Sequence, residues 1–243
     1  MSIIVEVKNI KKVYSSKAEV LEVLKGLNFK VRKGEHLCLL GRSGSGKTTT
    51  LNIIAGIDKP TSGSIKINEQ EITTLNRDKL AELRLKTMGY IFQEFHLLNH
   101  LTALENIMVP LIINGVKGDE AQERAYELLN LVGIQEKANN FVEELSTGQK
   151  QRIAVARAIA NKPKLLIADE PTGTLDSESS DAIMQLLTKI SEEQDMTMIF
   201  TTHDPYVARN ATRVLVLHEG LISELKVNPS KIDYGVLEEV YNL

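Results

Sequence analysis

The chain has 243 residues and a mass of 27.0 kDa, with 29 basic and 32 acidic side chains and a formal net charge of −3. A hydrophobic fraction of 42% excludes wholesale disorder, and the absence of a Lys/Arg block predicts no nucleic-acid partner. No apolar run approaches the roughly 18 residues of a membrane-spanning helix, and residues 1–7 lack the apolar core of a signal peptide, so we expect a cytoplasmic protein.

Apolar patterning predicts the elements of the first third of the chain. Strands are expected at residues 3–7, 24–31, 37–40 and 64–67, with a helix at 48–55 between a glycine-rich loop at 41–46 and a turn at 58–63. The single cysteine, Cys38, lies in one of these apolar runs and is predicted to be a buried strand residue rather than a reactive thiol.

The middle of the chain is helical in pattern, and strands return after Pro163. Helices are predicted at residues 78–86, 119–132, 147–160 and 179–193, and strands at 88–92, 164–168, 196–201 and 214–217. Thr102 and Glu105 fit a capping box at a helix start. Strands that alternate with helices at both ends indicate an α/β sheet, interrupted by a helical insertion.

Residues 226–243 form a short C-terminal tail. One apolar helical face is predicted there from Ile232, Val236, Leu237, Val240 and Tyr241. We expect this helix to pack on its own domain rather than to bind a partner.

Residues 41–48 match the pattern G-x-x-x-x-G-K-[ST] between a predicted strand and a predicted helix. Glycines let backbone N–H groups wrap around phosphates, and the start of the next helix favours negative charge. Lys47 would reach the β- and γ-phosphates, and the Thr48 hydroxyl would ligate Mg²⁺. The pattern therefore predicts a nucleoside-triphosphate site. The residues expected to contact the nucleotide here are Gly41, Ser43, Gly44, Ser45, Gly46, Lys47, Thr48 and Thr49.

A second acidic element follows the apolar run at residues 165–168. Asp169 and Glu170 come directly after this predicted strand, where alternating side chains cannot both perform the same task. One carboxylate is expected to bind Mg²⁺, and the other to accept a proton from an attacking water.

Residues 145–149 read Leu-Ser-Thr-Gly-Gln and precede Lys-Gln-Arg, just ahead of the acidic strand. This segment resembles the signature sequence of ATP-binding cassette (ABC) ATPases, and the resemblance covers residues 3–223 with every expected element in order. It implies a P-loop NTPase of α/β class with a RecA-like core, an antiparallel β subdomain and a helical subdomain at about 95–160. A single domain is then expected over residues 1–225.

The resemblance also implies roles for residues of the ATPase site. Tyr14 matches the aromatic that stacks on adenine, although an ordinary strand tyrosine is the alternative. Gln93 matches the glutamine that senses Mg²⁺ and couples to the membrane subunit, and Asp169 the metal-binding acid. Glu170 matches the general base, and His203 the histidine at the γ-phosphate.

A dimer with a second cassette is implied because the signature helix of one cassette meets the nucleotide bound by the other, and the second cassette can be an identical chain or a different one. Ser146, Gly148 and Gln149 match the residues that make this contact, and Asp176 matches the loop that crosses the dimer interface. Thr147 departs from the family pattern, where a glycine is usual. A β-branched side chain disfavours positive φ and adds bulk near the phosphate. Because Ser146 and Gly148 remain, we expect the contact to survive, with altered turnover.

Residues 78–86, 88–93 and 101–106 resemble one subgroup, the ATPases of lipoprotein-release, macrolide-export and cell-division ABC systems, with antimicrobial-peptide-resistance systems close by, and residues 169–173 are also typical of it. These ATPases often drive mechanical work by an integral-membrane permease, which would hold this chain peripherally at the cytoplasmic face of the membrane. Phe95, Leu97 and Leu98 lie in the segment expected to face that permease. Packing inside the helical subdomain is the alternative for each of them.

Three other classes of protein fit this sequence less well. A soluble ABC ATPase acting on DNA or ribosomes usually carries a long coiled coil, zinc-ligating cysteines or two cassettes, none of which this sequence contains. A GTPase would need Asn-Lys-x-Asp, whereas residues 161–164 lack the acid. A non-catalytic module would be expected to lose Glu170 or His203, and both are present.

Overall fold

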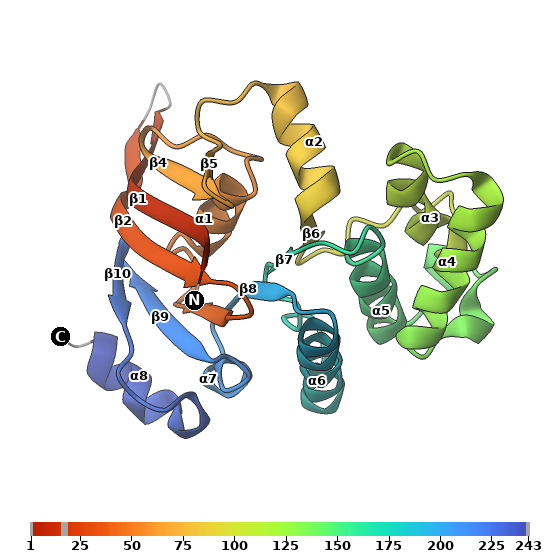
Figure 1. Ribbon diagram of the computed structural model, residues 1–243. Coiled ribbons are helices and arrows are strands. Elements are labelled where there is room, and N and C mark those ends of the chain that lie inside the picture. Colours follow the sequence, from red (N-terminus) through yellow and green to blue (C-terminus); the bar gives the residue numbers. More distant parts are fainter. Residues whose placement is uncertain (1, 16–18, 242–243) are drawn as a thin grey trace. The chain divides into compact units, whose positions relative to one another are not determined.

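The computed structural model describes residues 2–15 and 19–241, without the side chains of residues 239–241. The chain divides into two compact units, Met1–Ala81 with Thr197–Leu243, and Glu82–Met196. In Figure 1 the first unit holds the red-to-yellow and blue ends of the chain, and the second holds the green middle. The helical insertion expected at residues 95–160 lies inside the second unit, which also includes two strands and a long helix.

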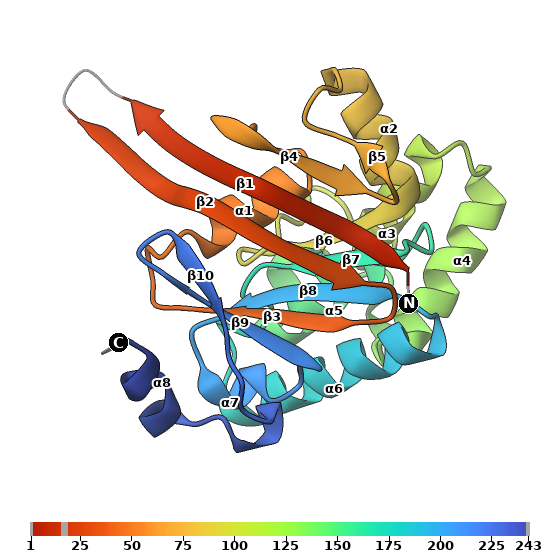
Figure 2. The ribbon, with the colours of Figure 1, turned by 60° about the vertical axis from the view of Figure 1, so that its left-hand side comes forward.

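The first unit contains a four-stranded antiparallel sheet in the order β2-β1-β4-β5. Its strands are β1 (Ile3–Ser15), β2 (Val20–Arg32), β4 (Ser62–Ile67) and β5 (Gln70–Glu71). Figure 2 shows β1 and β2 as a long ribbon beside β4. Both strands extend beyond their predicted bounds because register shifts, one of them between Val7 and Ile10, break the strict alternation that the sequence pattern tests.

The other paired strands of the first unit follow the order β10-β9-β3-β8, and β10 at the edge is largely exposed. They are β3 (His36–Leu40), β8 (Thr197–Thr202), β9 (Arg213–His218) and β10 (Leu221–Glu224). All five residues of β3 are buried, as expected for a strand with parallel partners on both sides. Cys38 is a buried strand residue as predicted, and burial raises the pKa of its thiol above the ordinary value.

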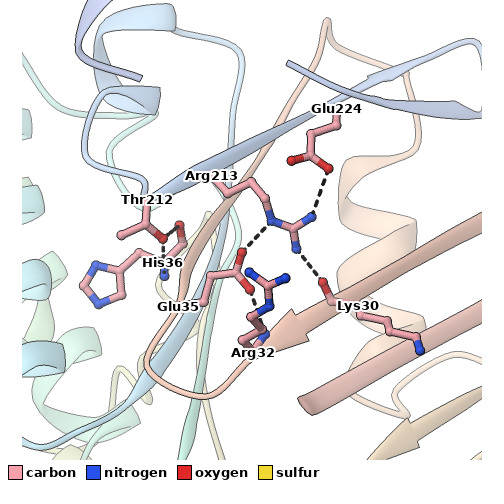
Figure 3. A network of polar contacts seen from close by, with 7 residues as sticks. All are labelled: Lys30, Arg32, Glu35, His36, Thr212, Arg213 and Glu224. Atoms are coloured by element: carbon pink, nitrogen blue, oxygen red, sulfur yellow. Dashed lines mark hydrogen bonds and ion pairs between the residues drawn. The ribbon is translucent and has the colours of Figure 1, made fainter. Parts of the chain in front are cut away.

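Arg213 on β9 joins three other segments of the first unit (Figure 3). Its guanidinium donates to Glu35 Oε1 at 2.5 Å, to Glu224 Oε2 at 3.4 Å, and to the backbone carbonyl of Lys30 on β2. The same Glu35 accepts from the backbone amide of Arg32 at 2.7 Å. This network ties the end of β2 to the start of β3 and thereby fixes where β3 begins.

The second unit contains a parallel strand pair and most of the helices. The pair is β6 (Met88–Ile91) and β7 (Leu165–Ala168), and the helices are α3 (Ala103–Ile113), α4 (Gly118–Leu131), α5 (Thr147–Ala158) and α6 (Ser177–Glu193). Helix α2 (Arg77–Thr87) crosses the division between the units. Short 3₁₀ turns at Gln135–Lys137 and Val142–Glu144 lead from α4 to α5.

The predicted capping box at the start of α3 is confirmed. Thr102 Oγ1 accepts from the amide of Glu105 at 3.2 Å, and Glu105 Oε2 accepts from the amide of Thr102 at 2.8 Å. Hydrogen bonds from Thr102 lower the pKa of Glu105. The fully buried Asn106 stabilises the turn before α3. Its side chain accepts from the amide of Leu98 and donates to the carbonyl of Leu98.

The tail folds onto the first unit. A 3₁₀ turn (Pro229–Lys231) leads into α8 (Tyr234–Tyr241), and Ile232 and Leu237 are buried, as expected for a helix that packs on its own domain. The predicted contributions of Val240 and Tyr241 lie outside the described side chains. No helix among the described residues has both the length and the apolar character needed to cross a membrane.

Three short elements were not predicted. They are β5, β10 and the helix α7 (Pro205–Ala208). Each has four residues or fewer, so none spans enough positions to produce a recognisable period.

Candidate nucleotide site

The loop at residues 41–46 joins β3 to α1 (Lys47–Ile54) in a conformation that requires glycine. Gly44 and Gly46 have φ of +79° and +103°, which residues with a side chain rarely adopt. A Cβ on Gly46 would lie 2.8 Å from Cδ2 of Leu24, and a Cβ on Gly41 would lie 2.5 Å from the carbonyl oxygen of Leu217. Three of the predicted contact residues are therefore glycines for steric reasons within the chain itself.

The start of α1 presents the groups that a phosphate chain needs. Gly46 is the N-cap and provides no side-chain hydrogen bond, so the positive end of the helix lacks a side-chain acceptor. Lys47 is buried, and its Nζ donates to the carbonyls of Gly41 at 2.9 Å and Arg42 at 3.2 Å. Ser45 Oγ is buried without a hydrogen-bond partner in the described part of the chain. These features fit an anionic ligand with several oxygen atoms.

His203 leaves the sheet beside this loop. It follows β8, whose last residue Thr202 is in register with Leu40 of β3. The amide of Gly41 donates to the carbonyl of Thr202 at 3.2 Å, so the two strands stay paired up to the point where both chains turn away. The exposed His203 and the phosphate loop therefore stand at the same edge of the first unit.

Tyr14 is held by two charged residues. Its hydroxyl donates to Asp58 Oδ2 at 2.8 Å, and Lys12 Nζ lies 4.6 Å from the centre of its ring. Lys12 Nζ also donates to Asp58 Oδ1 at 2.7 Å and to the carbonyl of Lys59 at 2.7 Å. Burial and the Asp58 hydrogen bond raise the pKa of Tyr14. Burial opposes the shift at Asp58, but hydrogen bonds from Lys12 and Tyr14 lower its pKa below the ordinary value.

The acidic residues and Gln93 belong to the second unit. Ile91 of β6 is in register with Ala168 of β7, and the amide of Asp169 donates to the carbonyl of Ile91 at 2.9 Å. Asp169 is 4% exposed, whereas Gln93 is exposed. The parallel pairing thus brings Gln93 and both predicted carboxylates to one strand edge.

Glu170 has a left-handed backbone with φ of 42°. Its carbonyl accepts from the amide of Gly173 at 3.0 Å, and a Cβ on Gly173 would lie 3.3 Å from Glu170 Oε2. A strained backbone at a residue that is not glycine persists only where its surroundings fix it, and such residues cluster at functional sites.

The signature segment forms the start of α5. Ser146 is the N-cap, and it forms a capping box with Gln149 through hydrogen bonds of 3.3 and 3.0 Å. Thr147 is the first helical residue of α5, where the predicted helix at residues 147–160 begins, and its φ is not positive. No described atom lies within 4 Å of a Cβ built on Gly148. This helix start therefore offers open space to a second molecule.

Asp176 is the N-cap of α6. It accepts from the amide of Ser179 at 2.9 Å and from its hydroxyl at 2.8 Å, and these hydrogen bonds lower the pKa of Asp176. The residue predicted for a dimer contact thus also begins the longest helix of the chain.

The predicted residues are divided between the two units, and the signature residues and Asp176 stand at the starts of α5 and α6 in the second unit. The first unit brings together the phosphate loop, its following helix start and His203, with Tyr14 tied to the turn at Asp58. The second unit brings Gln93 to Asp169 and Glu170. Sequence reasoning missed the residues that support these groups, namely Lys12, Asp58 and Arg157, because their partners lie 44 to 62 positions away along the chain.

The sequence profile of the family described as "ABC transporter" matches residues 24–173. The ABC transporter ATP-binding protein MJ0796 of Methanocaldococcus jannaschii is 43% identical over 220 residues, which are 89% of this chain and 94% of that protein. The macrolide export ATP-binding/permease protein MacB of Escherichia coli is 40% identical over 96% of this chain but 35% of its own length.

Solved structures agree with these matches. A structure titled as the dimeric post-hydrolysis state of the cassette MJ0796 bound to ADP and Pi has a TM-score of 0.85 and 40% identity, covering 92% of this chain and 99% of that one. CbiO1 of Clostridium perfringens, part of the transporter complex cbiONQ, has a TM-score of 0.83 and 30% identity, covering 100% and 93%.

The chain therefore belongs to the ATP-binding proteins of ABC transporters and has their P-loop NTPase fold. It is an ATPase, and one of its relatives, MacB, is named as a macrolide export protein.

Proposed function

We propose that two copies of this chain close around two molecules of Mg-ATP and use their hydrolysis to drive a membrane permease. The phosphate loop carries the proposal. The start of α1 has no side-chain cap, and Lys47 bonds the carbonyls of the loop itself. The Ser45 hydroxyl is buried and has no hydrogen-bond partner among the described residues. The adenine would stack on Tyr14, and residues Gly41 and Ser43 to Thr49 would surround the phosphates.

Mg²⁺ would be held by Thr48, Gln93 and Asp169. All three supply oxygen atoms, the donors that this ion prefers. Among the described residues no cluster of three or more His, Cys, Asp or Glu could hold a metal. Magnesium needs few protein ligands, because it is usually bound by one or two carboxylates together with substrate phosphates. When bound, the ion would neutralise negative charge on the phosphates.

The remaining chemistry is assigned to residues of the chain. Lys47 would leave the carbonyls of Gly41 and Arg42 to bind the β- and γ-phosphates. Glu170 would orient the attacking water and accept its proton, while His203 would hold the γ-phosphate. Phosphoryl transfer depends mainly on positioning and charge neutralisation, so the strained Glu170 backbone would serve by aiming its carboxylate.

Dimerisation is proposed from the signature helix. The open surface at Gly148, at the positive end of α5, suits the γ-phosphate of a nucleotide bound by the second copy. Ser146 and Gln149 would contribute from the same helix start, and Asp176 from the neighbouring N-cap. The MJ0796 relative is described as dimeric, which supports this arrangement.

The permease partner is proposed to dock near Leu98, which is 39% exposed, together with Phe95 and Leu97, which are half-buried. This would keep the chain peripheral at the cytoplasmic face of the membrane, with no nucleic-acid partner. We further propose residues 1–225 as one ATPase domain, with a helical subdomain at about 95–160 and a tail at 226–243.

The variant Glu170→Gln tests the mechanism. Loss of the general base should reduce ATP turnover by roughly 10²–10⁴-fold and trap an ATP-bound dimer. Turnover is measured by phosphate release, and the dimer by size-exclusion chromatography with light scattering. Lys47→Ala is the matched control, because it should neither bind ATP nor dimerise. Parental turnover in Glu170→Gln would refute the role of Glu170, and a trapped monomer would refute the dimer.

The partner is tested with the same variant. Tagged Glu170→Gln is purified from mild-detergent membranes with Mg-ATP, and the co-eluting proteins are identified. A polytopic partner with a large extracytoplasmic domain supports the transporter proposal. Recovery of soluble or nucleic-acid-associated proteins alone contradicts it and favours a non-transport ABC ATPase.

A further inference from the structure

The segment that follows Gln93 has an unusual backbone. Phe95 and His96 are consecutive residues with φ of 60° and 48°, in the left-handed region that favours glycine. Phenylalanine is poorly suited to this region, and two adjacent left-handed residues persist only when surrounding groups fix them. Some contact outside the segment must therefore stabilise it.

Arg157 makes that contact. It lies in the last turn of α5, and its two terminal nitrogens donate to the two carbonyls of the left-handed pair, Nη2 to Phe95 and Nη1 to His96, each at 2.5 Å. The guanidinium is a rigid fork whose parallel N–H groups match two neighbouring acceptors, a geometry that a lysine ammonium cannot reproduce. Burial of this group lowers the pKa of Arg157, which nevertheless remains charged.

The other side of Gln93 is also held. The rings of Tyr90 and Phe92 stack with their centres 4.3 Å apart. The ring of Phe92 is also tilted against the imidazole of His96, with the two ring centres 4.7 Å apart. Tyr90 is half-buried, and its pKa is raised by burial and by the nearby charge of Asp169. Gln93 thus lies between an aromatic anchor and the Arg157 contact, while its own side chain is exposed.

Arg157 and the signature residues belong to the same helix. Helix α5 has 12 residues and spans about 18 Å from the Ser146 cap to its end. The N-terminal end of α5 presents the surface proposed for the nucleotide of the second copy. At the C-terminal end, Arg157 bonds the segment that follows Gln93. A continuous helix transmits a displacement at one end to the other.

We propose that Arg157 is a positioning residue that sets the place of Gln93 and ties it to the signature helix. Movement of α5 on dimer closure would pull the carbonyls of Phe95 and His96 and thereby move Gln93. This inference rests on the proposed function of Gln93 and deepens it, because it identifies the group through which the Gln93 segment would respond to the second copy.

The test uses the full chain with Arg157→Met, which keeps the aliphatic length but removes both donors, and Arg157→Lys, which keeps the charge without the fork. Arg152→Met is the matched control, since Arg152 is on the same helix and donates to a different carbonyl, that of Val132, at 2.6 Å. Hydrogen exchange is measured by mass spectrometry, and ATP turnover is measured across ATP and Mg²⁺ concentrations.

In Arg157→Met, exchange at residues 92–98 should rise roughly tenfold, while exchange in α3 and the first turns of α5 stays parental. Turnover at saturation should fall by roughly tenfold or more, with the Mg²⁺ dependence shifted to higher concentration and the KM for ATP within about twofold. Arg157→Lys should fall between Met and the parent. Adding Phe95→Gly, which suits a left-handed backbone, should recover part of the turnover lost in Arg157→Met.

Parental exchange at residues 92–98 in Arg157→Met overturns the inference. Faster exchange throughout α3 and α5 also overturns it, because Arg157 would then serve only the fold. The variant Gln93→Ala tests the proposed role of Gln93 separately from the positioning role of Arg157. If Gln93→Ala keeps parental turnover and Mg²⁺ dependence, the proposed role of Gln93 fails, while the exchange result for Arg157 still decides whether Arg157 positions the segment.

Discussion

Replacing Asp58 with alanine tests the contacts that hold Tyr14. Asp58 accepts hydrogen bonds from Lys12 and from the Tyr14 hydroxyl, and the side chains of Lys12 and Asp58 are only 11% and 31% exposed. Breaking a buried ion pair costs about 3–5 kcal/mol and an exposed one costs about 0–1 kcal/mol. For this partly buried pair we expect a loss of about 2–3 kcal/mol in the free energy of unfolding.

The assay is urea unfolding followed by far-UV circular dichroism, because the chain contains no tryptophan. Asp58→Asn keeps an acceptor oxygen and should lose about 1 kcal/mol. Asp181→Ala, at an exposed position on α6, is the control and should stay within about 0.5 kcal/mol of the parent. If Asp58→Ala also stays within about 0.5 kcal/mol of the parent, the burial argument is refuted.

The same variant should weaken ATP binding about fivefold, equivalent to roughly 1 kcal/mol, because the Tyr14 ring loses its fixed orientation. A fluorescent ATP analogue measures this affinity, with Tyr14→Ala as reference. If Tyr14→Ala weakens binding and Asp58→Ala does not, the ring is oriented by other contacts.

The pH dependence of this contribution has a definite sign. The pKa of Asp58 is lower in the folded chain than its ordinary value of about 4. Its stabilising contribution is therefore complete above that ordinary value and is lost as pH falls through the folded pKa. Between pH 7 and pH 3 the parent should lose more stability than Asp58→Asn, as measured by urea midpoints at each pH.

Three further substitutions have expected outcomes. Thr102→Ala removes the cap of α3 and should lower the free energy of unfolding by about 1 kcal/mol in urea titrations, whereas an unchanged midpoint would contradict the capping argument. Gly148→Ala meets open space in the monomer, so its stability should stay within about 0.5 kcal/mol of the parent. In the Glu170→Gln background, however, Gly148→Ala should reduce the ATP-dependent dimer seen by light scattering. Leu98→Asp should reduce recovery of the permease from membranes, and full recovery would exclude this surface as the docking site.

Local patterns in the sequence determined most of the elements and several of their ends. The capping box at Thr102, the buried strand around Cys38 and the glycines of the phosphate loop were all predicted. These features depend on groups within a few residues of one another, or on a hydrophobic run long enough to indicate burial. The resemblance to ABC ATPases depended on the same kind of short, ordered motif.

Tertiary structure decided the surroundings of the predicted residues. Nothing in the sequence near Tyr14 indicates Asp58, 44 positions away, and nothing near Gln93 indicates Arg157, which bonds carbonyls 61 and 62 positions earlier in the chain. A long-range hydrogen bond depends on where distant segments of the chain meet in the folded protein. The spacing of residues along the chain does not predict these meeting points.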